Sequence, residues 1–339
     1  MDKVLYELGW SLQESGNAAD AVKYFTSMIN EHPDTPLAAD AAYFIGQQHY
    51  NAQDWKKAAS QFAIAAEKAP EPELSEKALY RWGWSEFKGQ DYEEAEQAFA
   101  KQAAEHADGR LAIDALMMVG ECRFKRADFE AAVEGFDEAR QVIRDRKDDA
   151  KSVRDPAERR VRELVFLHGG QSEAQLKRWN KAIEWYDELR DRFPSTQYLP
   201  QVFYETGFAY QQLDDQDNAL KFFQEVADNY RNVLAARARF MIGEIHFAKR
   251  EFDIAIPEFQ RVMYGFGAEK APSQIKNWQA KSGFEAGRCG ELLMQTAKSP
   301  ASKQKARKIA TDFFEYVMEK HPNHELAAKS RDQIEALRK

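Results

Sequence analysis

Small and aromatic residues recur at fixed spacings along most of the chain. A glycine is followed by an alanine twelve residues later and by an aromatic residue four positions further on, as in Gly46, Ala58 and Phe62. The first four glycines of this pattern are 37 residues apart, at Gly9, Gly46, Gly83 and Gly120. A regular period of this length is typical of a protein built from stacked, similar units.

Each unit predicts two antiparallel helices joined by a turn. Ala58 and Phe62 are four residues apart and therefore share one face of a helix. The spacing of twelve from glycine to alanine spans the end of one helix and the start of the next. Small residues at both positions let the helices cross closely, and the aromatic side chain fills the remaining space. Aspartates directly before the second helix are expected to cap it: Asp54, Asp91 and Asp128.

The pattern divides the chain into four segments. Regular repeats one to four occupy residues 1–140, and repeats five to eight occupy residues 164–322. Residues 323–339 are predicted to form a polar capping helix. In repeat eight, Ala310 and Phe314 come 11 residues late, so we expect an insertion around Thr296–Ser302.

Residues 141–163 break the period with a run of mixed charge. We predict that a prolonged helix and a loop lead to a new helix near Pro156, capped by Asp155, with the charges on a solvated face. The alternative is a charged protrusion that docks an acidic partner or lets the two halves flex.

Composition narrows the class of protein. Charged residues make up 31% of the chain and the formal net charge is -8, which opposes nucleic-acid binding. Cys122 and Cys289 stand in repeats too far apart for a disulfide, so we expect buried, reduced thiols. The chain shows no membrane span and no signal peptide, and exposed apolar positions near Met1 suggest a piece of a longer protein or a mature form.

The repeated frame resembles the tetratricopeptide repeat. The family's small residue, alanine, aromatic residue and closing proline match three sets best: Gly9, Ala21, Phe25, Pro33; Gly46, Ala58, Phe62, Pro70; and Gly170, Ala182, Tyr186, Pro194. The resemblance implies an all-α, right-handed superhelical solenoid of about eight helix-turn-helix repeats, closed by the C-terminal capping helix. Where the family favours a large apolar side chain, three residues after the glycine, this chain has His49, Glu86, Arg123 and His246.

The links between repeats suggest a subtype. Residues 32–46, 192–207 and 321–330 look like those of bacterial envelope proteins, such as the periplasmic TolA-binding coordinator and the lipoprotein of the outer-membrane barrel-assembly machine. This resemblance favours a periplasmic or cell-envelope location, although the sequence itself leaves the compartment unknown.

The resemblance also implies that the first helix of each repeat lines a concave face. Positions three before, one after and four after the glycine form one stripe on that helix. In repeats one to three it carries most of the candidate partner-binding residues: Tyr6, Trp10, Tyr43, Gln47, Tyr50, Tyr80, Trp84 and Phe87. These side chains either form a groove for an extended peptide or helix, or serve only to pack neighbouring repeats together.

No catalytic motif, cofactor motif or metal-ligand set is recognisable in the sequence. His321 and His324 straddle Pro322 without a third ligand nearby. We therefore expect a non-catalytic scaffold that binds a protein or peptide and no small-molecule substrate. Two alternatives remain: the docking or regulatory segment of a larger enzyme, and a helical-repeat nucleic-acid binder, which the acidic charge disfavours.

Overall fold

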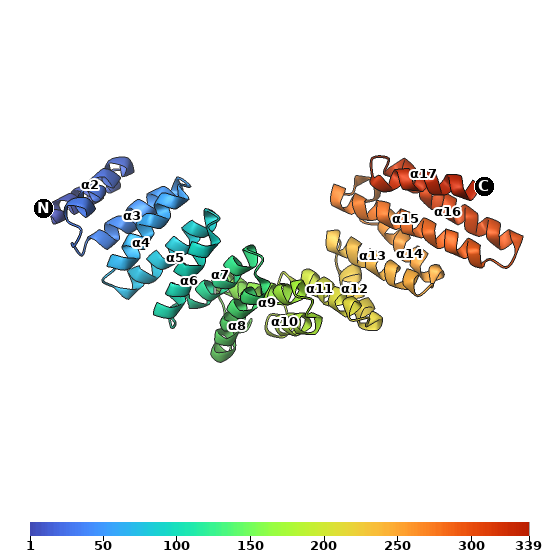
Figure 1. Ribbon diagram of the computed structural model, residues 1–339, viewed down its shortest axis with the longest axis horizontal. Helices are drawn as coiled ribbons and strands as arrows, with labels where there is room; N and C mark the ends of the chain where they lie inside the picture. Colours follow the sequence, from blue (N-terminus) through green and yellow to red (C-terminus); the bar gives the residue numbers. More distant parts are fainter. Residues whose placement is uncertain (339) are drawn as a thin grey trace. The chain divides into compact units, whose positions relative to one another are not determined.

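Helices joined by short turns make up the computed structural model, which describes residues 1–338 (Figure 1). Within these residues there are 17 α-helices, one 3-10 helix and no strand. The all-α solenoid predicted from the period is therefore confirmed. Within residues 1–195 and within residues 196–338, consecutive helices pack against one another as hairpins, and each hairpin packs on the next one of the same part.

The bounds of the helices follow the repeats. The first helix of each repeat, helix A, is in chain order α1 (Asp2–Glu14), α3 (Ala38–Asn51), α5 (Pro72–Lys88), α7 (Ala112–Lys125), α9 (Pro156–Gln175), α11 (Leu199–Gln212), α13 (Val233–Ala248) and α15 (Ser273–Thr296). The second, helix B, is α2 (Ala18–Glu31), α4 (Trp55–Lys68), α6 (Tyr92–Glu105), α8 (Phe129–Arg146), α10 (Trp179–Arg192), α12 (Gln216–Asn229), α14 (Phe252–Tyr264) and α16 (Pro300–Lys320). The 3-10 helix η1 (Ala268–Lys270) precedes α15, and α17 (Glu325–Arg338) follows α16.

The chain divides into two units, Met1–Ser195 and Thr196–Lys339. The first holds α1 to α10 and the second holds α11 to α17. Each unit has its own buried apolar layer between helices A and B, built mainly from alanines and aromatic residues.

A glycine and an aromatic ring meet where the two helices of a repeat cross. Phe99 in α6 has no exposed surface, and its ring lies against the backbone of Gly83 in α5. A Cβ atom at Gly83 would lie 2.7 Å from ring carbons of Phe99. The same contact recurs in every other repeat, for example between Gly120 and Phe136. Glycine is therefore required for close approach of the ring, and the spacing in the sequence follows from this geometry.

The predicted helix caps are present. The side chain of Asp54 accepts a hydrogen bond from the backbone N–H of Lys57, at 3.4 Å. Asp91 and Asp128 accept equivalent bonds at the start of α6 and α8. Each aspartate satisfies a backbone donor that the first turn of a helix leaves open.

The charged segment follows the predicted order of helix, loop and helix. Helix α8 continues to Arg146, and α9 begins at Pro156 with the side chain of Asp155 accepting two backbone N–H groups. The prediction of a solvated face is wrong for part of it. Arg162 donates to Asp148 at 2.9 Å, and these residues are only 5% and 9% exposed. Two opposite charges can be buried together because each satisfies the other.

Other contacts fix this segment inside the first unit. The backbone N–H of Ala150 donates to the carbonyl of Arg192 at 3.0 Å. Arg140, Arg144 and Arg192 all bind the carboxylate of Glu188 on α10. Much of the charge here pairs within the protein, so the segment offers little support for a hinge between two halves.

The expected insertion in repeat eight is not a loop. The link from α15 to α16 is only residues 297–299, and the extra residues lengthen both helices. Thr296 lies nine residues beyond Gly287, whereas α3 ends five residues beyond Gly46. Ser299 precedes the first helical residue, Pro300, and forms a capping box with Ser302, so α16 starts ten residues before Ala310.

The two cysteines and the last helix contribute buried side chains to the core. Cys122 and Cys289 are free and buried, and burial raises the pKa of each thiol to about 12. Helix α17 packs on α16, and its Ile334 and Leu337 form a buried cluster with Ala310 and Phe314 of α16. The final residue of the predicted cap, Lys339, lies outside the described residues.

Replacement of Gly83 by alanine should destabilise the first unit, because the new methyl group would overlap the ring of Phe99. We expect a loss of about 1–3 kcal/mol in the free energy of unfolding, the usual cost of overpacking a core. Gly89 is a matched control in the same repeat, since a Cβ there meets its nearest atom at 3.3 Å and the backbone is right-handed. Urea unfolding monitored by circular dichroism checks this; equal midpoints for G83A and G89A would contradict the role given to the crossing.

Candidate partner-binding surface on helices A

Helices A lie on the inner side of each unit. Within the first unit α3 contacts α5 and α7 contacts α9; within the second α11 contacts α13 and α13 contacts α15. In the part of the chain that the structure describes, neighbouring helices B make no comparable contacts. A stack whose A helices approach one another while its B helices spread apart curves around helices A. Helices α3 and α5, which carry most of the predicted stripe residues, therefore lie on the concave side of the first unit.

In repeat one, the stripe aromatics rest on the core phenylalanine of the same repeat. The rings of Tyr6 and Trp10 lie 5.9 and 5.6 Å from that of Phe25, both edge to face. Trp10 also contacts Phe44 of repeat two at 5.6 Å. Both stripe residues remain half-buried, with part of each ring open to solvent.

Repeat two repeats this arrangement and adds a cation. Tyr43 and Tyr50 lie 5.3 and 6.4 Å from the ring of Phe62. The guanidinium of Arg81, from the next helix A, sits 5.2 Å from the centre of the Tyr50 ring. Gln47, between the two tyrosines, donates to Asn51 at 2.9 Å and is half-buried.

Repeat three carries the largest aromatic cluster of the stripe. Tyr80 and Trp84 lie 6.1 and 6.2 Å from the ring of Phe99. Phe87 contacts Trp84 at 5.6 Å and Tyr92 at 5.2 Å. Edge-to-face contacts of this kind hold the rings in fixed orientations.

Three later repeats bury the side chain that lies three residues before the glycine. At the position of Tyr6, the residues Met117, Tyr204 and Phe240 are only 7%, 4% and 9% exposed. The guanidinium of Arg237 stacks 4.6 Å from the centre of the Tyr204 ring. At the other aromatic positions of the stripe, Phe124, Phe208 and Phe247 stay half-buried, so repeats one to three differ in having several half-buried aromatic side chains per repeat.

Groups of both charges border the open part of the stripe. Burial raises the pKa of Tyr80, and the charge of nearby Asp114 on α7 raises it further. Burial also raises the pKa of Asp114 itself, to about 6. Arg81 and Lys88 contribute positive charge, the latter 5.8 Å from the centre of the Trp84 ring. The open stripe is thus aromatic with a mixed rim, and no single sign of charge selects its partner.

The predicted stripe omitted Arg81, Lys88 and Asp114. Arg81 lies two residues before Gly83 and Asp114 six residues before Gly120, so both have fixed places in the repeat. Their registers could have been read from the period. Their contacts with Tyr50 and Tyr80 could not, because these cross from one repeat to the next.

The structure offers no arrangement that would hold a metal. Among residues 1–338, no three His, Cys, Asp or Glu side chains come together as possible ligands. His324 instead lies 3.0 Å from Asn277, through Nε2 and Oδ1, and His321 lies near the hydroxyl of Tyr316.

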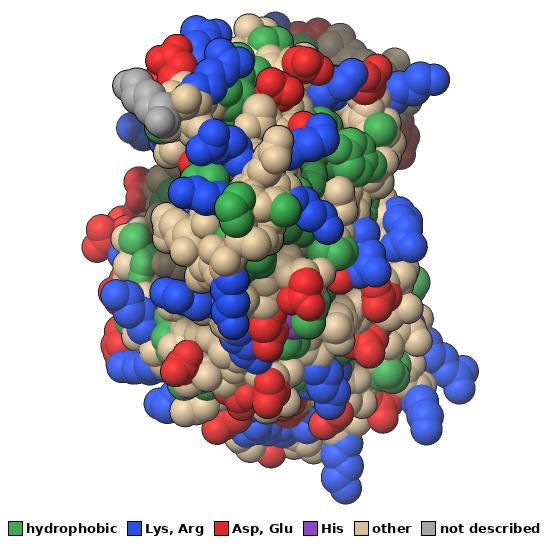
Figure 2. Space-filling model, turned by 90° about the vertical axis from the view of Figure 1, so that its right-hand side faces the viewer, with side chains coloured by type: hydrophobic (Ala, Val, Ile, Leu, Met, Phe, Trp, Pro, Cys, Tyr) green, Lys and Arg blue, Asp and Glu red, His purple; other side chains and the backbone are tan. Residues whose placement is uncertain are grey.

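No helix among residues 1–338 is both long and apolar enough to cross a membrane. On the face in Figure 2, basic and acidic side chains are interspersed.

Comparison with known proteins identifies the repeat. Two family models, both described as tetratricopeptide repeat, match residues 6–71 with 80–149 and residues 201–232. No curated protein sequence matches the chain significantly.

One of the similar solved structures has a TM-score above 0.5 and supports the fold. The C-terminal part of a TPR repeat-containing protein from Cytophaga hutchinsonii is 15% identical with a TM-score of 0.55, over 85% of this chain and 98% of that one. YrrB, described as a TPR protein with an unusual peptide-binding site, is 18% identical with a TM-score of 0.46, over 63% and 96%. PilF of Pseudomonas aeruginosa is 15% identical with a TM-score of 0.42, over 69% and 94%.

Asp114 should make stability depend on pH. Its folded-state pKa, about 6, lies above the ordinary value of 3.8, so stability falls as pH rises between these values. We expect D114N to gain stability over the wild type between pH 4 and pH 7, by on the order of 1–3 kcal/mol. Urea unfolding at both pH values tests this, with D108N, at an exposed position in the preceding turn, as the control. A constant difference across the pH range would show that burial of Asp114 does not perturb its titration.

Proposed function

We propose that the chain is a tetratricopeptide-repeat protein and a non-catalytic scaffold whose helices α1, α3 and α5 bind a peptide segment of a protein partner; the matches to tetratricopeptide-repeat models support this. Repeats of this family generally mediate contacts between proteins. The observation that carries the proposal is the row of half-exposed aromatic side chains on helices A of repeats one to three.

The packing of these rings suits them to binding. Each repeat supplies at least two aromatic side chains that already rest on a buried phenylalanine, so little side-chain freedom remains to be lost when a partner binds. Tyrosine and tryptophan offer large contact areas with a polar group at one edge, which is why they dominate binding energy in many interfaces. Arg81 and Lys88 add donors for carbonyl or carboxylate groups of a bound segment.

The same contacts also support the packing interpretation. Tyr6, Tyr43 and Tyr80 each touch the core ring of their own repeat, so their removal costs some stability whichever interpretation holds. The two interpretations differ in what the exposed part of each ring does. Only the binding interpretation requires a partner to cover it.

We also propose that this scaffold works in the envelope of a bacterial cell. The support is the resemblance of the inter-repeat links to those of envelope proteins. Two of these links share one geometry, in which a buried Thr35 or Thr196 follows the end of helix B and its hydroxyl accepts the N–H of Leu37 or Tyr198. Assembly of envelope components is the process that this resemblance favours.

A photo-crosslinking amino acid at Gln47 should capture the partner. Gln47 stands between Tyr43 and Tyr50 in the stripe, so a bound segment would pass within reach of it. The same amino acid at Tyr24, an exposed position on helix B of repeat one, is the control. We expect one species, identified by mass spectrometry, from position 47 and not from position 24. Equal capture at both positions would place the partner elsewhere.

Substitution of Trp84 by alanine should then separate binding from packing. We expect at least a tenfold loss of affinity for the captured partner, as for an aromatic residue that dominates an interface. Circular dichroism and the melting temperature show how much of this arises from unfolding. A lower melting temperature with unchanged affinity would support packing alone.

Fractionation of the cells that produce the protein tests the envelope proposal. We expect the protein in the periplasmic or membrane-associated fraction, detected with an antibody and compared with marker proteins of each compartment. Recovery in the cytoplasmic fraction alone would refute the location and leave the stripe untouched.

A further inference from the structure

The link between repeats seven and eight departs from the others. In several repeats the residue that follows helix B has a negative φ, as at His106 and Phe193, where φ is -128°. Helix α14 instead ends at Gly265, and Phe266, Gly267 and Ala268 all have positive φ, at 53°, 93° and 43°. Only glycine adopts this region without steric cost, so the fold maintains a strained turn here.

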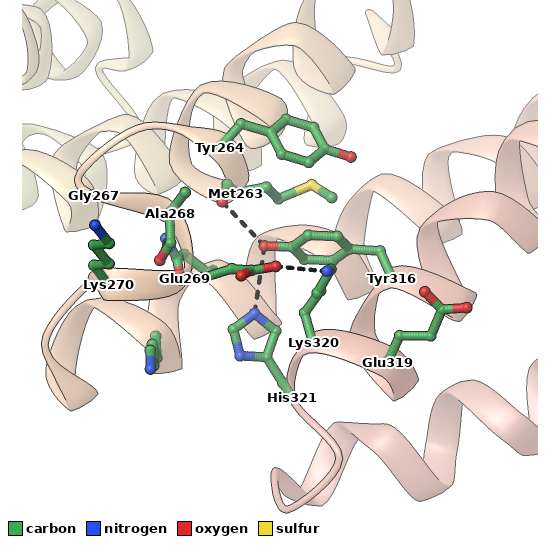
Figure 3. A pocket seen from close by; sticks show the side chains of 12 residues that line it. Met263, Tyr264, Gly267, Ala268, Glu269, Lys270, Tyr316, Glu319, Lys320 and His321 are labelled. Atoms are coloured by element: carbon green, nitrogen blue, oxygen red, sulfur yellow. Dashed lines mark hydrogen bonds and ion pairs between the residues drawn. The ribbon is translucent and has the colours of Figure 1, made fainter.

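This turn leaves a cavity of about 660 Å³ within the second unit (Figure 3). It lies between the end of α14, the helix η1, the first half of α15 and the end of α16, away from the predicted stripe. Its apolar wall is formed by Met263, Tyr264 and Tyr316. A volume of this size accommodates several side chains of a bound segment.

The apolar wall is held in place by the protein itself. The hydroxyl of Tyr316 donates to the carbonyl of Met263 at 3.0 Å, and His321 Nε2 lies 3.4 Å from the same hydroxyl (Figure 3). Tyr264 packs edge to face on Tyr316 at 5.5 Å and still exposes 57% of its surface. An exposed tyrosine on a fixed aromatic support is a preformed contact for an apolar side chain.

Three lysines and two glutamates border this wall. Lys320 pairs with Glu269 across the cavity at 2.6 Å. Lys270 and Lys276 also line it, and within residues 1–338 neither makes an ion pair or side-chain hydrogen bond. Lys276 and Lys320 extend into an adjoining depression of about 280 Å³, next to His324. Of the two glutamates in the lining, Glu269 pairs with Lys320, and Glu319 on α16 makes no ion pair among residues 1–338.

We propose that this cavity binds an acidic peptide segment of a partner protein, with an apolar side chain on Tyr264 and Tyr316 and its carboxylates on Lys270 and Lys276. Charge complementarity supports this occupant, because two unpaired lysines border an aromatic wall in a chain whose formal net charge is -8. The cavity belongs to the second unit and the stripe of α1, α3 and α5 to the first, so the two surfaces share no residue.

Selection from a displayed library of random 12-residue peptides tests the proposal. The full chain is the target, and peptides that also bind the double variant K270E/K276E are discarded. We expect the remaining peptides to be rich in Asp and Glu beside Leu or Phe. A synthetic, fluorescent copy of one such peptide is then titrated by anisotropy at low and high salt, and its affinity should fall as salt rises.

Matched variants make the outcome decisive. K270E/K276E and Y264A should each weaken binding of this peptide at least tenfold, and E319Q should strengthen it. K303E/K305E makes the same charge change at exposed positions in the first turns of α16 and should leave affinity within twofold. Trp84→Ala should have no effect, so failure here is distinguishable from failure of the proposed stripe.

Three results would overturn the proposal. The first is a selection without acidic peptides that depend on the two lysines. The second is equal affinity of the selected peptide for the wild type and Y264A, with circular dichroism showing that both are folded. The third is self-association of the wild-type chain, seen by sedimentation and abolished in K270E/K276E, which would place a second copy in the cavity.

Discussion

The contact between a glycine and an aromatic ring at each helix crossing determines both the fold and the candidate surface. The ring of Phe25 or Phe99 can lie against helix A only because Gly9 or Gly83 lacks a Cβ atom. The same ring then supports the stripe: Tyr6 and Trp10 rest on Phe25, and Tyr80 and Trp84 rest on Phe99. Residues that specify the hairpin therefore also orient the side chains that would meet a partner. A mutation at the crossing would disturb binding through geometry, without touching the partner.

The hairpins could be predicted from sequence because their determinants are local. A spacing of twelve and four, a capping aspartate and a small residue all act within one repeat. The charged segment was harder, because its outcome depends on pairing across the fold. Nothing in a run of mixed charge shows that Arg162 will be buried against Asp148 while Arg154 nearby remains exposed. In repeat eight the period revealed 11 extra residues, but not their conformation. Ser299 before Pro300 was the overlooked sign of a helix start.

The repeat positions of the candidate surface residues could be predicted from the sequence, but the exposure of their side chains could not. Tyr6 and Tyr204 occupy equivalent positions, yet Tyr6 is half-open and Tyr204 is 4% exposed. One cause of this difference in exposure is the residue of the following helix A that lies beside the ring. Arg237 stacks on Tyr204, whereas the equivalent residue beside Tyr6 is the shorter Asp40. Because such contacts join neighbouring repeats, a motif aligned within one repeat cannot reveal them. That the stripe residues bind a partner therefore stays a prediction, whereas their positions on helices A are observed in the structure.

A repeat array also explains why the second candidate surface lies at a defect. Each repeat contacts mainly its neighbours, so a change in one link costs stability locally and leaves the rest of the stack intact. The strained turn at Phe266, Gly267 and Ala268 is such a change, and the long hairpin of α15 and α16 beside it is another. This link leaves Tyr264 exposed beside Lys270 and Lys276, which make no ion pair within the described residues. A turn with this steric cost is easier to understand if the space it opens is used than if it merely joins two helices.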